Sequence, residues 1–315
     1  MDLKVSHFNS FRQLLEQVVN GEREDSIPKT QLASTRHESS NSSWAGTRTF
    51  EDAIDLANNG WPEGRKQIEI YTKEYTKLWQ RFFPQQDFGS EMRQQESGSI
   101  IIMDEFLKGS PDCMLDFNPN EESDDKLKGS KLQRMIINAC CNCHISIEAI
   151  YQRGALLAAL VNSMELSGFN VEIVVVWQVD SGGGWGRESK NQQLRYTLTL
   201  KKFQDFLDTD TLAFTLAHPS MLRRLIFTLI EQEPKRYVDN YVYSGYGTTT
   251  DINDNEVAKY GASYGGELKN GNMYFKYMDN NYSEKQLVDQ CTAIVKEHFT
   301  EVDMNAKAKD KDSSK

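Results

Sequence analysis

Three cysteines and a histidine lie within five consecutive positions near the middle of this 315-residue chain. Cys140 and Cys143 have the CxxC spacing of a zinc site, Cys141 lies between them, and His144 follows directly. The sequence holds no second CxxC pair and no HxxxH pair to complete four ligands. Cysteine is also a small apolar residue that is common in cores. We therefore interpret the cluster as core and expect neither a metal nor another cofactor. Stoichiometric zinc in the purified protein would favour the alternative, an enzyme with a Cys/His metal site.

The sequence also lacks the common motifs of catalytic and nucleotide-binding sites. Residues 182–186 are rich in glycine, as in loops that approach phosphate groups, but the lysine and serine of a P-loop do not follow. No GxGxxG lies at a predicted strand-to-helix turn, and GxSxG and HExxH are absent. The five histidines are scattered along the chain. The sequence thus predicts a protein that is not an enzyme.

The strongest functional signal is a mixture of basic and aromatic residues in segments 184–202 and 234–247. Proteins that bind single-stranded nucleic acid use such mixtures, because cations contact phosphates while aromatic rings stack on bases. With an arginine pair from the helix between them, these segments predict a site for single-stranded DNA. Its residues are Trp185, Arg187, Lys190, Arg195, Tyr196, Lys201, Lys202, Arg223, Arg224, Lys235, Arg236, Tyr237, Tyr241 and Tyr243. Tyrosines also fill cores and interfaces, which is the alternative interpretation.

Overall composition limits these possibilities. The net charge of −10 repels polyanions at long range, so nucleic acid would need a local basic groove. No run of about 18 apolar residues predicts a membrane span, and the N-terminal residues lack the apolar core of a signal peptide. The odd number of cysteines, five, does not suggest a disulfide framework and is typical of a reducing cytoplasm.

The elements that would position these residues are organised around a strand, a long helix and a second strand. The strand is expected at 134–140, the helix at 146–166 with Ser146 as its N-cap, and the second strand at 171–179. The second strand is almost entirely apolar, which indicates burial on both faces. This pattern predicts a βαβ crossover and an α/β fold with an open mixed sheet.

The flanking segments predict further elements and five regions. Helices are expected at 6–19, 221–232 and 283–299, and a helical hairpin at 44–83 begins at the capping box of Thr49 and Asp52. Short strands are expected within 98–118 and at 194–200. The predicted regions are a helix with a flexible arm (1–43), the hairpin (44–97), the α/β core (98–236), a Tyr/Gly-rich extension with a helix (237–299) and a disordered tail (300–315).

Three sequence blocks resemble a family of uncharacterised tailed-phage proteins. They are WAGTRTFEDAIDLANNGWPEG, QRGALLAALVNSMELSGFNVEIVVVW and LAFTLAHPSMLRRLIF, in that order, within about residues 44–235. The resemblance implies a protein made in the host cytoplasm and carries no activity with it.

The central unit also resembles a von Willebrand factor type A fold, an open α/β sheet with a metal-ion-dependent adhesion site after its first strand. That site uses an Asp-x-Ser-x-Ser pattern, whereas this chain has Ala139-Cys140-Cys141-Asn142-Cys143 there. The resemblance therefore implies a degenerate domain, a scaffold without the metal ion.

Size, acidity and the basic-aromatic segments are similar to those of the single-stranded-DNA-binding RNA polymerase cofactors of some lytic podoviruses. Two hypotheses follow. The first is a phage protein that binds single-stranded DNA and serves transcription or replication, with a phage RNA polymerase as a further partner. The second is a non-catalytic structural or assembly protein whose degenerate core holds a protein partner.

Overall fold

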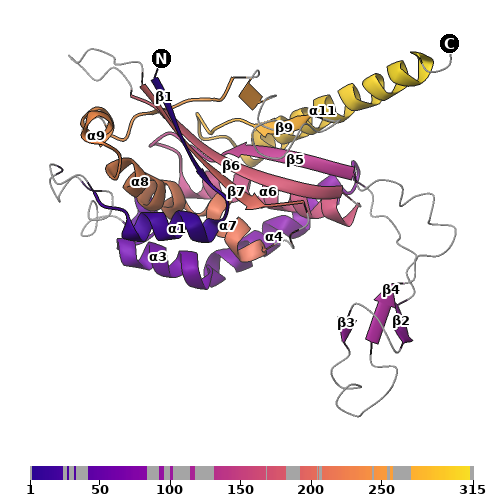
Figure 1. Ribbon diagram of the computed structural model, residues 1–315. Helices are drawn as coiled ribbons and strands as arrows, with labels where there is room; N and C mark the ends of the chain where they lie inside the picture. The colour runs from indigo at the N-terminus through magenta and orange to yellow at the C-terminus, as the bar shows by residue number, and fades with distance from the viewer. Residues whose placement is uncertain are drawn as a thin grey trace.

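A six-stranded mixed sheet forms the centre of the protein (Figure 1). The computed structural model describes residues 2–23, 27, 32, 42–83, 92–95, 100–101, 114–117, 131–167, 169–181, 192–203, 205, 208–242, 245–253, 256–257 and 271–312, some as backbone only. The strands are β1 (Asp2–Phe8), β5 (Lys131–Asn138), β6 (Phe169–Asp180), β7 (Gln192–Lys201), β8 (Thr248–Thr249) and β9 (Asn272–Phe275). Their order is β1-β7-β6-β5-β9, with β8 paired to β6.

Strand directions confirm the predicted α/β class with an open mixed sheet. β5 runs parallel to β6 and to β9, and β1 runs parallel to β7, whereas β7 is antiparallel to β6. Helix α6 (Ile147–Leu166) connects β5 to β6, and the Ser146 hydroxyl accepts from the Ala149 amide at 3.2 Å. All residues from 171 to 179 are buried, as the apolar run predicts. The predicted strand 134–140 lies at Lys131–Asn138 in the structure.

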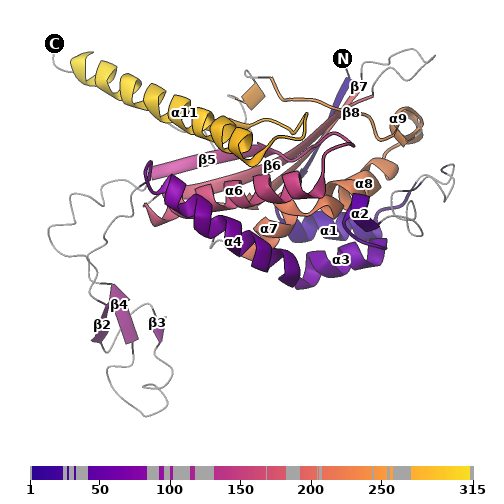
Figure 2. The same cartoon turned by 180° about the vertical axis from the view of Figure 1, so that it is seen from behind.

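The remaining helices gather mainly on one side of this sheet (Figure 2). They are α1 (Phe11–Asn20), α2 (Ser42–Ala45), α3 (Phe50–Asn59), α4 (Pro62–Trp79), α7 (Thr209–Ala217), the π-helical η3 (Met221–Ile226), α8 (Phe227–Glu231), α9 (Lys235–Tyr241) and α11 (Glu284–Asp312). The capping box of Thr49 and Asp52 at the start of α3 is confirmed. α3 packs against η3 and α7, whereas α4 packs against α6 and α7, so these consecutive helices have largely separate partners.

Three elements differ from the sequence-based expectation. The predicted helix 6–19 is split into β1 and α1, because residues 2–8 pair with β7, a partner far away in the chain. α11 begins near the start of the expected helix 283–299 but continues to Asp312. The strands within 92–117 are β2 (Met92–Gln95), β3 (Ile100–Ile101) and β4 (Met114–Phe117), which form a separate sheet of their own.

The two faces of the main sheet differ in chemistry. The helix-covered face is apolar and belongs to the large core, with Met135, Ile137, Ile173, Val175 and Trp177. We call the opposite side the polar face. It has a small apolar cluster, Ile136, Val174, Val176, Ile252 and Val257, and buried polar side chains, Arg134, Asn138, Glu172, Gln178, Arg195 and Thr197. The polar face thus buries charge within the same strands whose other side chains form an apolar core.

Candidate functional site

Two basic residues of the predicted DNA site point into the protein from β7. Arg195, 5% exposed, donates to Gln178 Oε1 at 2.5 Å and forms an ion pair with Glu256 at 2.9 Å. Lys201 forms an ion pair with Glu165 at 2.7 Å. Because each cation has an internal partner, neither side chain is available to a phosphate in this fold. The structure assigns both to the interior instead of a binding surface.

Three predicted stacking residues are also buried. The Tyr196 hydroxyl donates to Glu233 at 3.0 Å, that of Tyr237 to Asp2 at 3.1 Å, and that of Tyr241 to the Gln192 carbonyl at 2.7 Å. Burial raises the pKa of the Tyr196 phenol well above its usual value. A base can stack only on a ring face that it can reach, so these tyrosines fill the core, which was the alternative interpretation.

The arginine pair of η3 holds the segment that precedes α3. Arg223 donates to the Trp44 carbonyl at 2.6 Å, and its guanidinium lies 4.8 Å from the Trp44 ring. Arg224 donates to the carbonyls of Thr47 and Arg48 at 3.1 and 3.0 Å. Both arginines are buried, and burial lowers the pKa of Arg223. Both guanidinium groups therefore bind main-chain carbonyls inside the protein and are not accessible to a phosphate.

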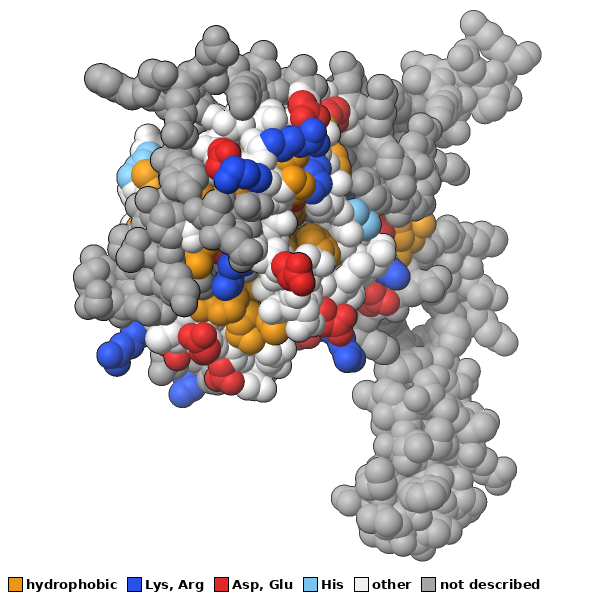
Figure 3. Space-filling model, turned by 60° about the vertical axis from the view of Figure 1, so that its left-hand side comes forward, with side chains coloured by type: hydrophobic (Ala, Val, Ile, Leu, Met, Phe, Trp, Pro, Cys, Tyr) orange, Lys and Arg blue, Asp and Glu red, His pale blue; other side chains and the backbone are white. Residues whose placement is uncertain are grey.

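Three predicted site residues are exposed, Lys202, Lys235 and Arg236. Lys202 follows the last residue of β7, whereas α9 lies at the strand's first residue, because Asn240 donates to Gln192 at 2.7 Å. A ten-residue strand is about 30 Å long, so Lys202 lies far from Lys235 and Arg236. On the face in Figure 3, lysines and arginines alternate with aspartates and glutamates. Trp185, Arg187, Lys190 and Tyr243 lie outside the described residues.

The cysteine cluster follows β5 and is partly core. Cys140 is fully buried, and its thiol donates to the Gln178 carbonyl at 3.5 Å. Burial raises the pKa of that thiol, which disfavours the thiolate that a metal needs. Cys143 is exposed. In the part of the chain that the structure describes, no three His, Cys, Asp or Glu side chains come together as a metal site.

The crevice between the ends of β5 and β9 is the place where an open α/β sheet would usually bind a ligand, because the strand order reverses there. In this protein the chain itself closes it. The Asn142 amide donates to the Met278 carbonyl at 3.1 Å, and the Met278 amide donates to the Cys140 carbonyl at 3.0 Å. These bonds continue the pairing of β5 with β9 beyond the strands.

Arg153 reinforces this closure from α6. Its Nη2 donates to the carbonyls of Asn138 and Lys276, at 3.2 and 2.6 Å, which join the ends of β5 and β9. The Asn142 side chain donates to the Asp279 carbonyl at 2.8 Å and accepts from the Thr249 hydroxyl at 2.6 Å. These polar groups at the crevice thus form hydrogen bonds with each other.

An open groove of about 1230 Å³ lies beside this closed crevice, along β9 and α11. We call it the β9–α11 groove. Its lining combines the residues of β9 with a face of α11 and includes the aromatic rings of Tyr274, Tyr277 and Tyr282. Both views of the chain place α11 next to this end of the sheet (Figures 1 and 2). The small-molecule pockets of proteins in general are mostly smaller, with volumes of about 300–1,000 Å³.

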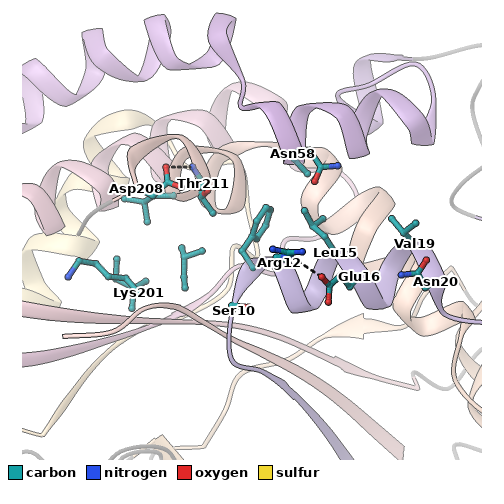
Figure 4. Close-up of a pocket in the computed structure, with 15 residues that line it drawn as sticks. Ser10, Arg12, Leu15, Glu16, Val19, Asn20, Asn58, Lys201, Asp208 and Thr211 are labelled. Atoms are coloured by element: carbon teal, nitrogen blue, oxygen red, sulfur yellow. Dashed lines mark hydrogen bonds and ion pairs between the residues drawn. The ribbon is translucent and has the colours of Figure 1, made fainter. Parts of the chain in front are cut away.

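A second groove, of about 650 Å³, lies among α1, α3, α7 and β7 (Figure 4). Phe11, Leu15 and Leu212 supply apolar surface. Its charged side chains have neighbours: Arg12 pairs with Glu16 at 2.9 Å, and Asp208 caps α7. This groove has fewer unpaired polar groups to orient a ligand than a typical binding site offers.

β9 was not predicted from the sequence, and neither was the larger groove beside it. The strand lies within the Tyr/Gly-rich segment, where glycine and asparagine predict loops. Its signal is short: in NMYF, Met273 and Phe275 are buried while Asn272 and Tyr274 are partly exposed. Alternation over four residues is too little to distinguish a strand from a loop.

Comparisons with known proteins give the family and no further relatives. Among the described helices, none combines the length and apolar character needed to cross a bilayer. The search of curated proteins and the search of solved structures both give no match. One family model covers residues 3–305, nearly the whole chain. The chain therefore belongs to the family described as Domain of unknown function (DUF7192).

Proposed function

We propose that this protein is a non-catalytic binding protein that holds a protein partner during the assembly of a tailed phage. The observation that carries the proposal is the closed crevice between β5 and β9. Arg153, Asn142 and Met278 use their hydrogen-bonding groups to join the ends of these two strands. A small ligand would have to break these bonds to enter, so binding is assigned to surfaces outside the crevice.

Two further features support a scaffold role. The resemblance to a von Willebrand factor type A fold concerns the unit of β5, α6 and β6, and the stretch after β5 has no carboxylate to hold a metal ion. The structure also contains a groove larger than most small-molecule sites. A protein partner fits such a surface better than a small substrate does.

The test is affinity capture of the tagged full chain from phage-infected cells, with and without nuclease treatment. The expected result is a phage protein retained in stoichiometric amount after nuclease digestion. A chain that retains only nuclease-sensitive partners, or no partner, would contradict the proposal. Metal analysis of the same preparation decides the zinc-enzyme alternative, because stoichiometric zinc would contradict a metal-free scaffold.

Single-stranded DNA binding, with a phage RNA polymerase as partner, is the second candidate. One local arrangement favours it: Ser181 and Gln192, which flank segment 182–191, are hydrogen-bonded at 3.0 Å, and α9 with Lys235 and Arg236 contacts Gln192. The sequence places Trp185, Arg187 and Lys190 within that segment. These residues could form a smaller basic-aromatic site than the sequence predicted.

A salt-titrated gel shift with single-stranded DNA tests this candidate. Each phosphate contact contributes about 0.7 to the slope of log K against log salt concentration. Lys235→Ala/Arg236→Ala should therefore reduce the slope by about 1.4. Lys202→Ala is the matched control, since that exposed cation lies at the other end of β7. Equal effects of the control and the double variant, or no binding at low salt, would contradict DNA binding through α9.

A further inference from the structure

We infer that the β9–α11 groove binds an extended segment of a partner protein, which adds to the sheet as a new strand beside β9. The inference deepens the proposed function and rests on it, because it assumes that the partner is a protein. Its basis is the part of β9 that borders the groove.

The groove runs along the edge of β9, not over one of its faces. Successive side chains of a strand point to opposite faces, so a cleft over a face would contact every second residue. Here nine consecutive residues, Gly271 to Asp279, line the groove. β9 pairs with β5 on one side, and no strand in the described ranges pairs with it on the other. An edge strand offers main-chain donors and acceptors to another chain.

Two walls enclose this edge. One is a face of α11, whose lining residues have helical spacing: Leu287, Gln290, Cys291, Ile294, Glu297 and His298. The other is the segment that contains Asp251 and Val257. Asn272 donates to the Val257 carbonyl at 2.7 Å, and the Tyr274 hydroxyl donates to Asp251 at 2.9 Å, which fixes this wall to β9. Strand addition needs an exposed sheet edge with pockets for alternate side chains, and these two walls can form such pockets.

Charge indicates what kind of segment fits. Carboxylates of Asp251, Asp279 and Glu297 line the groove, against Lys276 and the buried Arg153. Arg153 is buried, whereas Lys276, Asp279 and Glu297 are exposed, so carboxylates outnumber cations on the accessible lining. Apolar side chains of α11, such as Ile294, would accept alternate residues of the incoming strand. The partner segment is therefore extended, apolar at alternate positions and basic rather than acidic.

A display library of random peptides of about ten residues, screened against the full chain, tests this mode of binding. Enriched peptides should alternate apolar residues and contain lysine or arginine rather than aspartate or glutamate. With the best synthetic peptide bound, hydrogen exchange should slow at those amides of residues 272–275 that do not pair with β5. Methylating alternate peptide nitrogens should weaken binding by about tenfold or more, since strand addition depends on main-chain hydrogen bonds.

Two variants locate the site. Ala293 is an exposed residue of α11 that lines the groove, so Ala293→Arg should leave the fold intact and reduce peptide affinity by about tenfold or more. Ile70→Arg is the matched control, because Ile70 is 61% exposed on α4 and does not line the groove. Unchanged unfolding curves for both variants verify that they fold.

Failure of the inference can be told apart from failure of the proposed function. A library without binders, exchange protection outside β9, or equal peptide affinity of Ala293→Arg and the wild type would overturn strand addition. If the wild type and Ala293→Arg then retain the same nuclease-resistant partner, the scaffold function stands and only the site is wrong. If neither retains one, the proposed function falls as well.

Discussion

The two faces of the central sheet are held by different forces although they belong to the same strands. On the helix-covered face, Leu156, Leu160 and Trp177 are buried among other apolar side chains. On the polar face, Arg134 pairs with Glu172, and Arg195 pairs with Glu256. The helix-covered face gains stability from apolar area, whereas the polar face depends on complete pairing of groups that are expensive to bury alone.

This difference explains why Arg195 was predicted as a DNA contact although the structure buries it. Arg195 lies between Leu194 and Tyr196 in β7. In an alternating strand pattern, a basic residue between two apolar ones is predicted to face solvent. The expectation holds only when one face of a sheet is exposed. Here both faces are covered, and the charge of Arg195 is neutralised by Glu256. Glu256 lies 61 positions further along the chain, so local sequence patterns do not reveal it as the partner.

The largest expected effect tests the polar face. Arg134 is fully buried, pairs with Glu172 and donates to Asn272 at 3.2 Å. Arg134→Met leaves the Glu172 carboxylate buried without its cation, which should cost about 3–5 kcal/mol. Urea unfolding followed by circular dichroism measures the loss. A loss below about 1 kcal/mol would show that the pair is not needed for stability.

A double variant separates pairing from packing. Arg134→Met/Glu172→Leu removes both charges, and most of the lost stability should return, because apolar residues can replace a buried ion pair at little cost. The control is Leu160→Ala on the helix-covered face, which should cost about 2–5 kcal/mol. Adding Glu172→Leu to Leu160→Ala should lower stability further, because Arg134 then lacks its anion and the cavity lies on the opposite face. If Glu172→Leu instead restored the stability lost in Leu160→Ala, the two faces would not be independent.

The next effect concerns a titratable group on the helix-covered side. His218 is buried between Trp61 and Phe214, and its Nδ1 accepts from the Ser220 amide at 3.2 Å. Burial disfavours the charged imidazole and lowers its pKa to about 4. The unfolded chain therefore binds the proton more readily between pH 6.5 and about 4. Stability should be complete above this window and fall with pH through it, by about 3 kcal/mol.

Unfolding curves across this pH range measure the effect. His218→Asn is the control, because an asparagine oxygen can accept from the Ser220 amide without titrating. The variant should lose less stability than the wild type between pH 6.5 and 4. Equal pH dependence of the two proteins would show that His218 is not buried in its neutral form.

Much of the fold follows from local patterns, and little of the candidate site does. Ser146, the apolar run 171–179 and the Thr49 capping box each specify their element through near neighbours. β1 and β9 are strands because each pairs with a distant segment. The β9–α11 groove depends on that distant pairing, since an unpaired edge exists only once the strand order is set.

The smallest effect compares one threonine on each side of the sheet. On the polar face, the Thr197 hydroxyl lies 2.7 Å from His7 Nδ1. On the helix-covered side, Thr215 of α7 is buried, and no described residue forms a hydrogen bond with its hydroxyl. Thr197→Val should cost about 1 kcal/mol, because it removes a hydrogen bond. Thr215→Val should be neutral or stabilising, because it removes a buried polar group without a partner. Urea unfolding of the two variants should therefore show a lower free energy of unfolding for Thr197→Val and an unchanged or higher one for Thr215→Val. Equal losses would contradict the difference between the two faces.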